Sequence, residues 1–185
     1  CGRRLAWLAW DHPNMPWDDT RLMVADVTTA GGLTAVEEVV SEGESVLQPL
    51  WSPDGVLTFV SDRGNWWNLY RWEEGEVRCV FPVEGEFARP LWNLGQATYG
   101  YSGAGEIVAA FAQEATWRLA RLSPSRGLLS VVELPYSTLG EVRVQGERVL
   151  LLGGSPVRPE AVALVHLETG AVEEIVRAGS LEVEG

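Results

Sequence analysis

Few residues of this sequence have the types and spacing that hydrolytic chemistry requires. A serine hydrolase carries its nucleophile in a G-x-S-x-G turn between a strand and a helix. The nearest match is Gly100-Tyr101-Ser102-Gly103-Ala104, which lacks the last glycine. The residues that follow, Gly105-Glu106-Ile107, indicate a hairpin and not the start of a helix. We therefore predict no catalytic residue in this chain.

The histidines and the paired acidic residues offer little further chemistry. His12 lies in a proline-rich loop and His166 alternates with apolar residues in a predicted strand, so we expect structural roles for both. Paired carboxylates could hydrolyse glycosides or hold a peptide amino terminus. Adjacent residues of a strand point to opposite faces, however, and two of the pairs fall at turns. We predict solvated turn or edge charge at all four acidic doublets: Asp18-Asp19, Glu37-Glu38, Glu73-Glu74 and Glu173-Glu174.

Composition argues against metal, cofactor and nucleic-acid binding. The sequence has no cysteine or histidine pair at zinc spacing and no calcium loop rich in Asp and Gly, so we expect no metal and no cofactor. All 14 basic residues are arginine, which excludes lysine-based chemistry. The net charge of −12 opposes binding to a phosphate backbone. Cys79 lies in an apolar run and is predicted to be a buried, unreactive thiol.

No segment has the pattern of a membrane span or a secretion signal. No apolar run approaches the roughly 20 residues of a transmembrane helix. Arg3-Arg4 precedes an apolar run, Leu5 to Trp10, but that run has only six residues and no cleavage site follows it. We expect a cytoplasmic protein without membrane contact. Because the chain begins at Cys1 without an initiator Met, we also expect a piece of a longer protein.

The elements predicted around these residues are short strands. Apolar or alternating runs, rich in β-branched and aromatic side chains, recur between Gly, Pro, Asp and Ser. Pro49-Leu50-Trp51 recurs 41 residues later as Pro90-Leu91-Trp92. A second set of markers, spaced by 47, 50 and 45 residues, consists of Leu22, Leu69, Leu119 and Leu164. A period of ~40–50 residues with about four strands per repeat is typical of a β-propeller.

The predicted fold is all-β, a partial β-propeller of about four blades, each a four-stranded antiparallel sheet. The clearest blade has strands at 47–51, 56–61, 67–72 and 76–81, with Ser52-Pro53-Asp54-Gly55 as a tight turn after the first. The first blade opens with a strand at 5–10, so it is incomplete and lacks its first strand. We place the blades at about 1–40, 44–82, 87–135 and 139–177.

Three stretches resemble a known family. Trp51 to Gly55, with Phe59 to Tyr70, is similar to the propeller repeat of bacterial periplasmic propellers and of the prolyl oligopeptidase family. Leu5 to Asp18 resembles a signature of that family's acylaminoacyl-peptidase and dipeptidyl-aminopeptidase-like branch. Gly153 to Gly170 resembles the last propeller unit of the same branch. The resemblance implies a propeller that caps a C-terminal α/β-hydrolase domain with a Ser-Asp-His triad, and the sequence stops at Gly185, before any such domain.

This resemblance gives the expected function of the chain. It implies a non-catalytic propeller segment of a bacterial serine peptidase, which gates peptide access to the hydrolase domain of the same polypeptide. The expected partners are that domain and the peptide substrate. The alternative is a stand-alone propeller scaffold for protein–protein interaction, while the lack of convergent carboxylates disfavours a carbohydrate-active propeller. An arc of about four blades exposes apolar faces and a strand edge, so we expect the isolated chain to self-associate.

The loop from Asp11 to Asp18 is the main candidate contact site. Two prolines stiffen it, and its Met and Trp side chains are costly to leave in water. It forms either a rim that packs on the hydrolase or narrows substrate entry, or an aromatic lid over neighbouring blades. The loop from Asp62 to Trp67 joins the same two strands of the next blade, so we expect both loops on one face, with the second close to Asp11 and Asn14. The predicted rim or docking residues are Asp11, His12, Asn14, Trp17, Arg63, Asn65 and Trp66.

Overall fold

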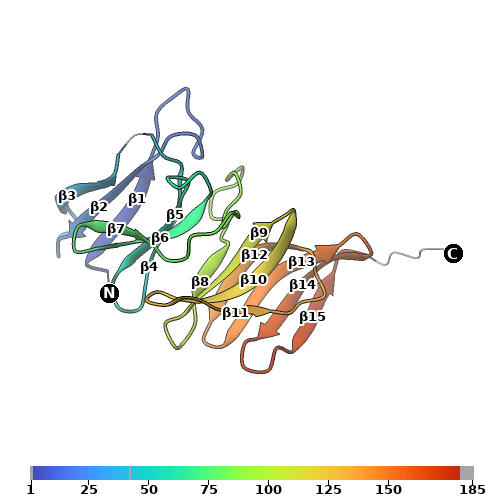
Figure 1. The fold of residues 1–185 in the computed structure, drawn as a ribbon. Coiled ribbons are helices and arrows are strands. Elements are labelled where there is room, and N and C mark those ends of the chain that lie inside the picture. The colour runs from blue at the N-terminus through green and yellow to red at the C-terminus, as the bar shows by residue number, and fades with distance from the viewer. Residues whose placement is uncertain (1, 42, 180–185) are drawn as a thin grey trace. The chain divides into compact units, whose positions relative to one another are not determined.

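Four antiparallel β-sheets make up the computed structural model, which describes residues 2–41 and 43–179 (Figure 1). The first sheet has three strands in the order β1-β2-β3, and each of the other three has four strands. No helix that could cross a membrane occurs in the described part of the chain. The predicted all-β class is confirmed, as is a partial propeller of about four blades with an incomplete first blade.

The strands follow one another along the chain as consecutive antiparallel neighbours within each sheet. The first sheet contains β1 (Arg4–Ala9), β2 (Arg21–Val27) and β3 (Leu33–Val40). The second contains β4 (Val46–Trp51), β5 (Leu57–Ser61), β6 (Asn68–Glu73) and β7 (Glu76–Cys79). The third contains β8 (Tyr99–Tyr101), β9 (Ile107–Gln113), β10 (Thr116–Ser123) and β11 (Gly127–Val132). The fourth contains β12 (Thr138–Gln145), β13 (Arg148–Ser155), β14 (Arg158–His166) and β15 (Val172–Arg177).

The first compact unit, Cys1–Val83 with Ala88–Gly95, contains the first two sheets. Apolar side chains of both sheets share one core, in which Leu22 and Phe59 are fully buried. Arg4 of β1 adds a polar link to the second sheet. Its guanidinium carbon lies 4.7 Å from the ring centre of Trp51 and 5.1 Å from that of Trp72. These cation–π contacts join β1 to β4 and β6 of the next sheet.

The second compact unit, Glu84–Phe87 with Gln96–Gly185, contains the third and fourth sheets. Its core again combines both sheets and includes Leu119 and Val149. Tyr136, in the connection before β12, packs its ring against Gly153 of β13. A Cβ atom on Gly153 would lie only 2.4 Å from Cδ2 of Tyr136. This close approach explains why a glycine occupies the strand interior at that position.

The turn between β4 and β5 follows from the sequence Ser52-Pro53-Asp54-Gly55. The Ser52 N–H donates to the Val56 carbonyl (2.8 Å), and the Gly55 N–H donates to the Ser52 carbonyl (3.0 Å). The Ser52 Oγ accepts the Val56 N–H (2.9 Å) and itself donates to the Asp54 carboxylate. Gly55 has a φ of 83°, where glycine is favoured. The predicted turn and the strands on either side of it are therefore present.

The recurrence of Pro-Leu-Trp, in contrast, was a wrong marker of the repeat. Pro49-Leu50-Trp51 lies in β4, but Pro90-Leu91-Trp92 lies in an irregular connection. The first strand of the third sheet is β8, so the second Pro-Leu-Trp does not mark the first strand of a blade.

The third sheet repeats the second with an offset of 50 residues, from Ser52 to Ser102. The Ser102 N–H donates to the Glu106 carbonyl (2.9 Å), and the Gly105 N–H donates to the Ser102 carbonyl (3.0 Å). The Ser102 Oγ accepts the Glu106 N–H (3.3 Å). The strand that precedes this turn, β8, is therefore the counterpart of β4.

Candidate functional site

The predicted rim residues nearest β1 lie in the connection from β1 to β2. The Asn14 N–H donates to the Asp11 carbonyl at 2.9 Å. The Asp11 carboxylate accepts a 2.7 Å hydrogen bond from Arg21 Nη2, which forms an exposed ion pair. His12 is exposed beside it. The loop is therefore ordered by its own hydrogen bonds; Asp11 and His12 are exposed, whereas Asn14 is half-buried.

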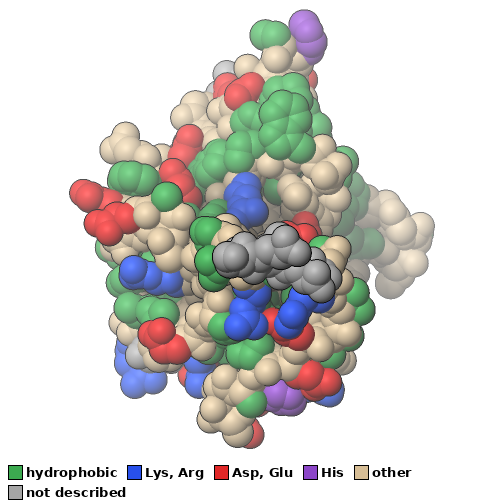
Figure 2. Space-filling view, turned by 90° about the vertical axis from the view of Figure 1, so that its right-hand side faces the viewer, with side chains coloured by type: hydrophobic (Ala, Val, Ile, Leu, Met, Phe, Trp, Pro, Cys, Tyr) green, Lys and Arg blue, Asp and Glu red, His purple; other side chains and the backbone are tan. Residues whose placement is uncertain are grey.

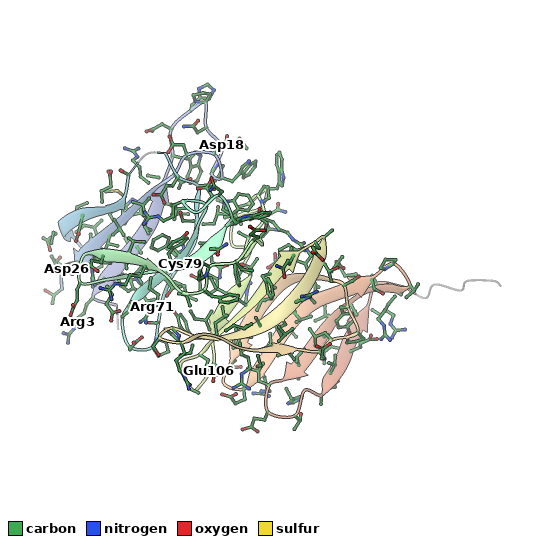
Figure 3. All side chains as sticks on the ribbon, viewed as in Figure 1. Arg3, Asp18, Asp26, Arg71, Cys79 and Glu106 are labelled. Atoms are coloured by element: carbon green, nitrogen blue, oxygen red, sulfur yellow. The ribbon has the colours of Figure 1, made fainter. Side chains whose placement is uncertain are left out.

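Trp17 has a different environment from the polar residues of its loop. Its ring is half-buried and lies 4.6 Å, centre to centre, from the ring of Trp92 at an interplanar angle of 53°. Pro16 beside it is buried, and its carbonyl accepts the Thr20 hydroxyl at 2.8 Å. Asp18, labelled in Figure 3, caps the turn by accepting the Met15 N–H at 2.8 Å. These contacts hold Trp17 in one position.

The second predicted group lies in the connection from β5 to β6. Arg63 makes a two-pronged ion pair with Glu44, with Nε–Oε2 and Nη2–Oε1 distances of 3.0 and 2.8 Å. Asn65 has a φ of 69° and donates its N–H to the Asp62 carbonyl at 2.7 Å. Trp66 is exposed. Arg63 is thus engaged in holding the loop, because its guanidinium is already paired with a carboxylate.

A short segment before β4 connects the two loops. The Glu44 carbonyl accepts the Thr20 N–H (2.8 Å), and the Asp19 carboxylate accepts the Gly43 N–H (2.8 Å). On the other side, the Asp62 carboxylate accepts the Ser45 N–H (2.8 Å). Both loops therefore lie beside the same segment, at one end of the first unit. The closer approach of Arg63, Asn65 and Trp66 to Asp11 and Asn14, and their role as a rim, stay predictions.

The remaining reactive side chains have structural partners. Ser102 is a buried turn residue, so the predicted hairpin after Tyr101 is confirmed. Cys79 was predicted to be buried and is half-buried, because it lies on the outer strand β7; burial raises the pKa of its thiol. Burial also raises the pKa of Tyr70 to about 12. No three His, Cys, Asp or Glu side chains gather into a possible metal site within residues 2–41 and 43–179.

The doublet Glu173-Glu174 differs from the predicted solvated charge. Glu174 of β15 accepts hydrogen bonds from Arg158 Nη1 (2.8 Å) and Arg177 Nε (3.0 Å) and from the Tyr136 hydroxyl (3.1 Å). Hydrogen bonds from Arg177 and Arg158 lower the pKa of Glu174 to about 2. Glu173 is exposed as predicted. No local pattern indicates this difference, since it depends on which face of β15 meets Tyr136.

A cavity of about 390 Å³ lies in the second unit, where the chain leaves β11 for β12. Arginine, glutamate and aromatic side chains line it together, so it has no single chemical character. The lining residues are Thr116, Trp117, Arg118, Leu119, Val131, Val132, Glu133, Leu134 and Tyr136.

Comparison with solved structures places this fold among peptidases. A puromycin-hydrolyzing peptidase of Mycobacterium tuberculosis is 36% identical over 95% of the chain, with a TM-score of 0.87. A puromycin hydrolase, solved as a mutant complexed with PGG, is 31% identical over 98% of the chain, with a TM-score of 0.88. The chain spans only 27% and 28% of the lengths of these two proteins. No family model and no curated protein sequence matches the chain.

More distant structures share the fold alone. Prolyl oligopeptidase B of Galerina marginata is 12% identical over 97% of the chain, with a TM-score of 0.70. TolB of Acinetobacter baumannii is 15% identical over 96% of the chain, with a TM-score of 0.51.

The sheets and these structural relatives define the chain as part of a β-propeller. It belongs to the prolyl oligopeptidase family of peptidases, as a segment of the propeller.

Proposed function

We propose that this segment helps to cap the α/β-hydrolase domain of a serine peptidase, so that only short or unstructured peptides reach the catalytic triad. The observation that carries this proposal is the identity of 31% to 36% with puromycin-hydrolysing enzymes over nearly the whole chain. Those enzymes are more than three times as long as the part that this chain matches. The acylaminoacyl-peptidase or dipeptidyl-peptidase type, and a cytoplasmic location, belong to the same proposal.

Exclusion of large peptides depends on the shape of the entrance and requires no catalytic side chain in this segment. A propeller edge formed by stiff loops can narrow an entrance without touching the bond that breaks. In the first unit, the loops after β1 and β5 are held by hydrogen bonds to one segment, Gly43 to Ser45. Such a fixed edge suits a filter because a mobile one would admit larger peptides.

The test uses the full-length parent and a series of reporter peptides of increasing length. We expect turnover to fall steeply with length in the parent, and no turnover by residues 1–185 alone. Ser102→Ala in the parent should leave turnover of the shortest peptide unchanged, since Ser102 is a turn residue. Loss of that turnover in the Ser102 variant would contradict the proposal.

The reading frame itself separates the scaffold alternative from the peptidase. A peptidase parent must encode a G-x-S-x-G motif, then Asp and His, downstream of Gly185. A frame that ends near Gly185 would favour a stand-alone scaffold instead.

A further inference from the structure

The first unit exposes Trp92 and Leu94, two residues apart in the connection from β7 to β8, and the ring of Trp92 lies against that of Trp17. These three residues, Trp17, Trp92 and Leu94, form the apolar patch. Trp92 is 75% exposed and Leu94 is 77% exposed. In Figure 2, hydrophobic side chains gather in the upper part of the face shown, at the height of the β1–β2 connection in Figure 1. Large apolar side chains exposed together on a protein surface mark a contact site for another surface.

The patch is rigid before any contact is made. Trp17 is fixed by the buried Pro16 and by the Thr20 hydroxyl, which donates to the Pro16 carbonyl. The ring of Trp92 rests on that of Trp17, and the backbone N–H of Trp92 donates to the Pro90 carbonyl at 3.0 Å. Tryptophans held in this way lose little side-chain freedom on binding, which is a property of residues that dominate interface energies.

We infer that the patch of Trp17, Trp92 and Leu94 is the contact surface on this segment for the α/β-hydrolase domain of the same polypeptide. This inference rests on the proposed function. The patch lies on connections beyond the strand ends, whereas the sheets of each unit contact one another through side chains of their strands. A further blade would therefore cover a sheet face, and not this patch.

The charges near the patch disfavour a second copy of the chain as its partner. Asp11 and Asp18 are exposed in the same loop as Trp17, and the whole chain carries a net charge of −12. Two copies that met through the patch would bring these carboxylates together. The length of the relatives favours the hydrolase domain, because nearly three quarters of each lies outside the matched part.

The decisive experiment is site-specific photo-crosslinking in the full-length parent. Leu94 is replaced by the photoreactive residue benzoylphenylalanine, and the matched control carries it at Ala104, an exposed position in the turn after β8. We expect Leu94 crosslinks to map to the hydrolase domain, and Ala104 crosslinks not to do so. Crosslinks from Leu94 to other blades or to a second copy, or no crosslink to the hydrolase domain, would overturn the inference.

A functional measurement separates failure of the inference from failure of the proposed function. In the parent, Trp92→Ala should relax the length limit, so that the ratio of turnover of long peptides to turnover of short peptides rises several-fold. The control is Leu150→Ala, which also removes a large exposed apolar side chain, on β13, and should leave this ratio unchanged. An unchanged ratio in Trp92→Ala, in a parent that does discriminate by length, defeats only the inference. A wild-type parent without any length limit defeats the proposed function.

Discussion

Glu174 illustrates how one carboxylate can link three segments of the chain. It accepts hydrogen bonds from Arg158, Arg177 and Tyr136, which come from β14, β15 and the connection before β12. Its pKa is lowered from 4.5 to about 2, mainly by the bonds from Arg177 and Arg158. A carboxyl group whose pKa is lower in the folded protein than in the unfolded chain stabilises the fold at pH values above its unfolded-state pKa. That stability is lost as the pH falls from about 4.5 toward 2.

We therefore predict that Glu174→Gln is less stable than wild type at neutral pH and that this difference shrinks toward about pH 3. Urea unfolding at several pH values measures it. Glu173→Gln is the matched control, because the neighbouring carboxylate is exposed and should show almost no difference at any pH. A difference between Glu174→Gln and wild type that stays constant with pH would contradict the assigned role.

Gly153 gives a second prediction at the scale of single residues. In Gly153→Ala, the new Cβ would meet Cδ2, Cγ and Cε2 of Tyr136 at 2.4, 2.6 and 2.8 Å. We expect a loss of about 1–3 kcal/mol in unfolding free energy, typical of an overpacked core. Gly154→Ala is the control, because its nearest atom would be the Thr138 hydroxyl at 3.3 Å.

A double variant tests whether the clash itself causes the loss. When Tyr136→Ala is already present, Gly153→Ala should cost much less, since the ring is gone. Full additivity of the two changes, measured by urea unfolding, would mean that Gly153 is required for another reason.

At the scale of elements, the serine turns after β4 and β8 predict a graded response. Ser52 Oγ accepts the Val56 N–H at 2.9 Å and also donates to Asp54. Ser102 Oγ accepts the Glu106 N–H at the longer distance of 3.3 Å. Ser52→Ala should therefore lower the unfolding free energy by about 0.5–1.5 kcal/mol, and Ser102→Ala by less. Equal losses in the two variants, or a reversed order, would contradict this reading of the turns.

These turns also show which parts of the fold the sequence could predict. Ser52-Pro53-Asp54-Gly55 specifies its own conformation, so the strands on both sides were located within one residue. Pro90-Leu91-Trp92 is a wrong repeat marker, because three matching residues do not make a strand unless the segment pairs with a neighbouring strand. The corresponding turn of the third sheet also has a serine and a glycine, Ser102 and Gly105, but the residues before it are Tyr99-Gly100-Tyr101 and not Pro-Leu-Trp.

The candidate site was predictable only in part, for the same reason. Local composition singled out Trp17 and its loop, but nothing local connects Trp17 with Trp92, which lies 75 residues further along the chain. The partners of Arg63 and Glu174 were missed as well. The partners of both residues depend on which segments become neighbours in the fold. A periodic pattern locates the blades but does not show which side chains of different segments meet.

For the whole molecule, the open edge of the first sheet leads to a prediction of self-association. In the described part of the chain β1 pairs only with β2, whereas β5, β9 and β13 each lie between two strands. The other edge of β1 thus offers unpaired backbone groups to another chain. Leu5 on β1 is 43% exposed, and Leu33 and Val36 of β3 are exposed as well. We expect residues 1–185 to form dimers or larger species that grow with concentration in light scattering.

Salt and one charged substitution distinguish edge pairing from nonspecific aggregation. The net charge of −12 repels a second copy, so added salt should strengthen the association by screening. Leu5→Lys should weaken it, because a charge on an edge strand opposes pairing, while Val157→Lys, on the connection between β13 and β14, should not. A monomer at every concentration, or equal effects of both lysines, would show that the edge of β1 does not drive association.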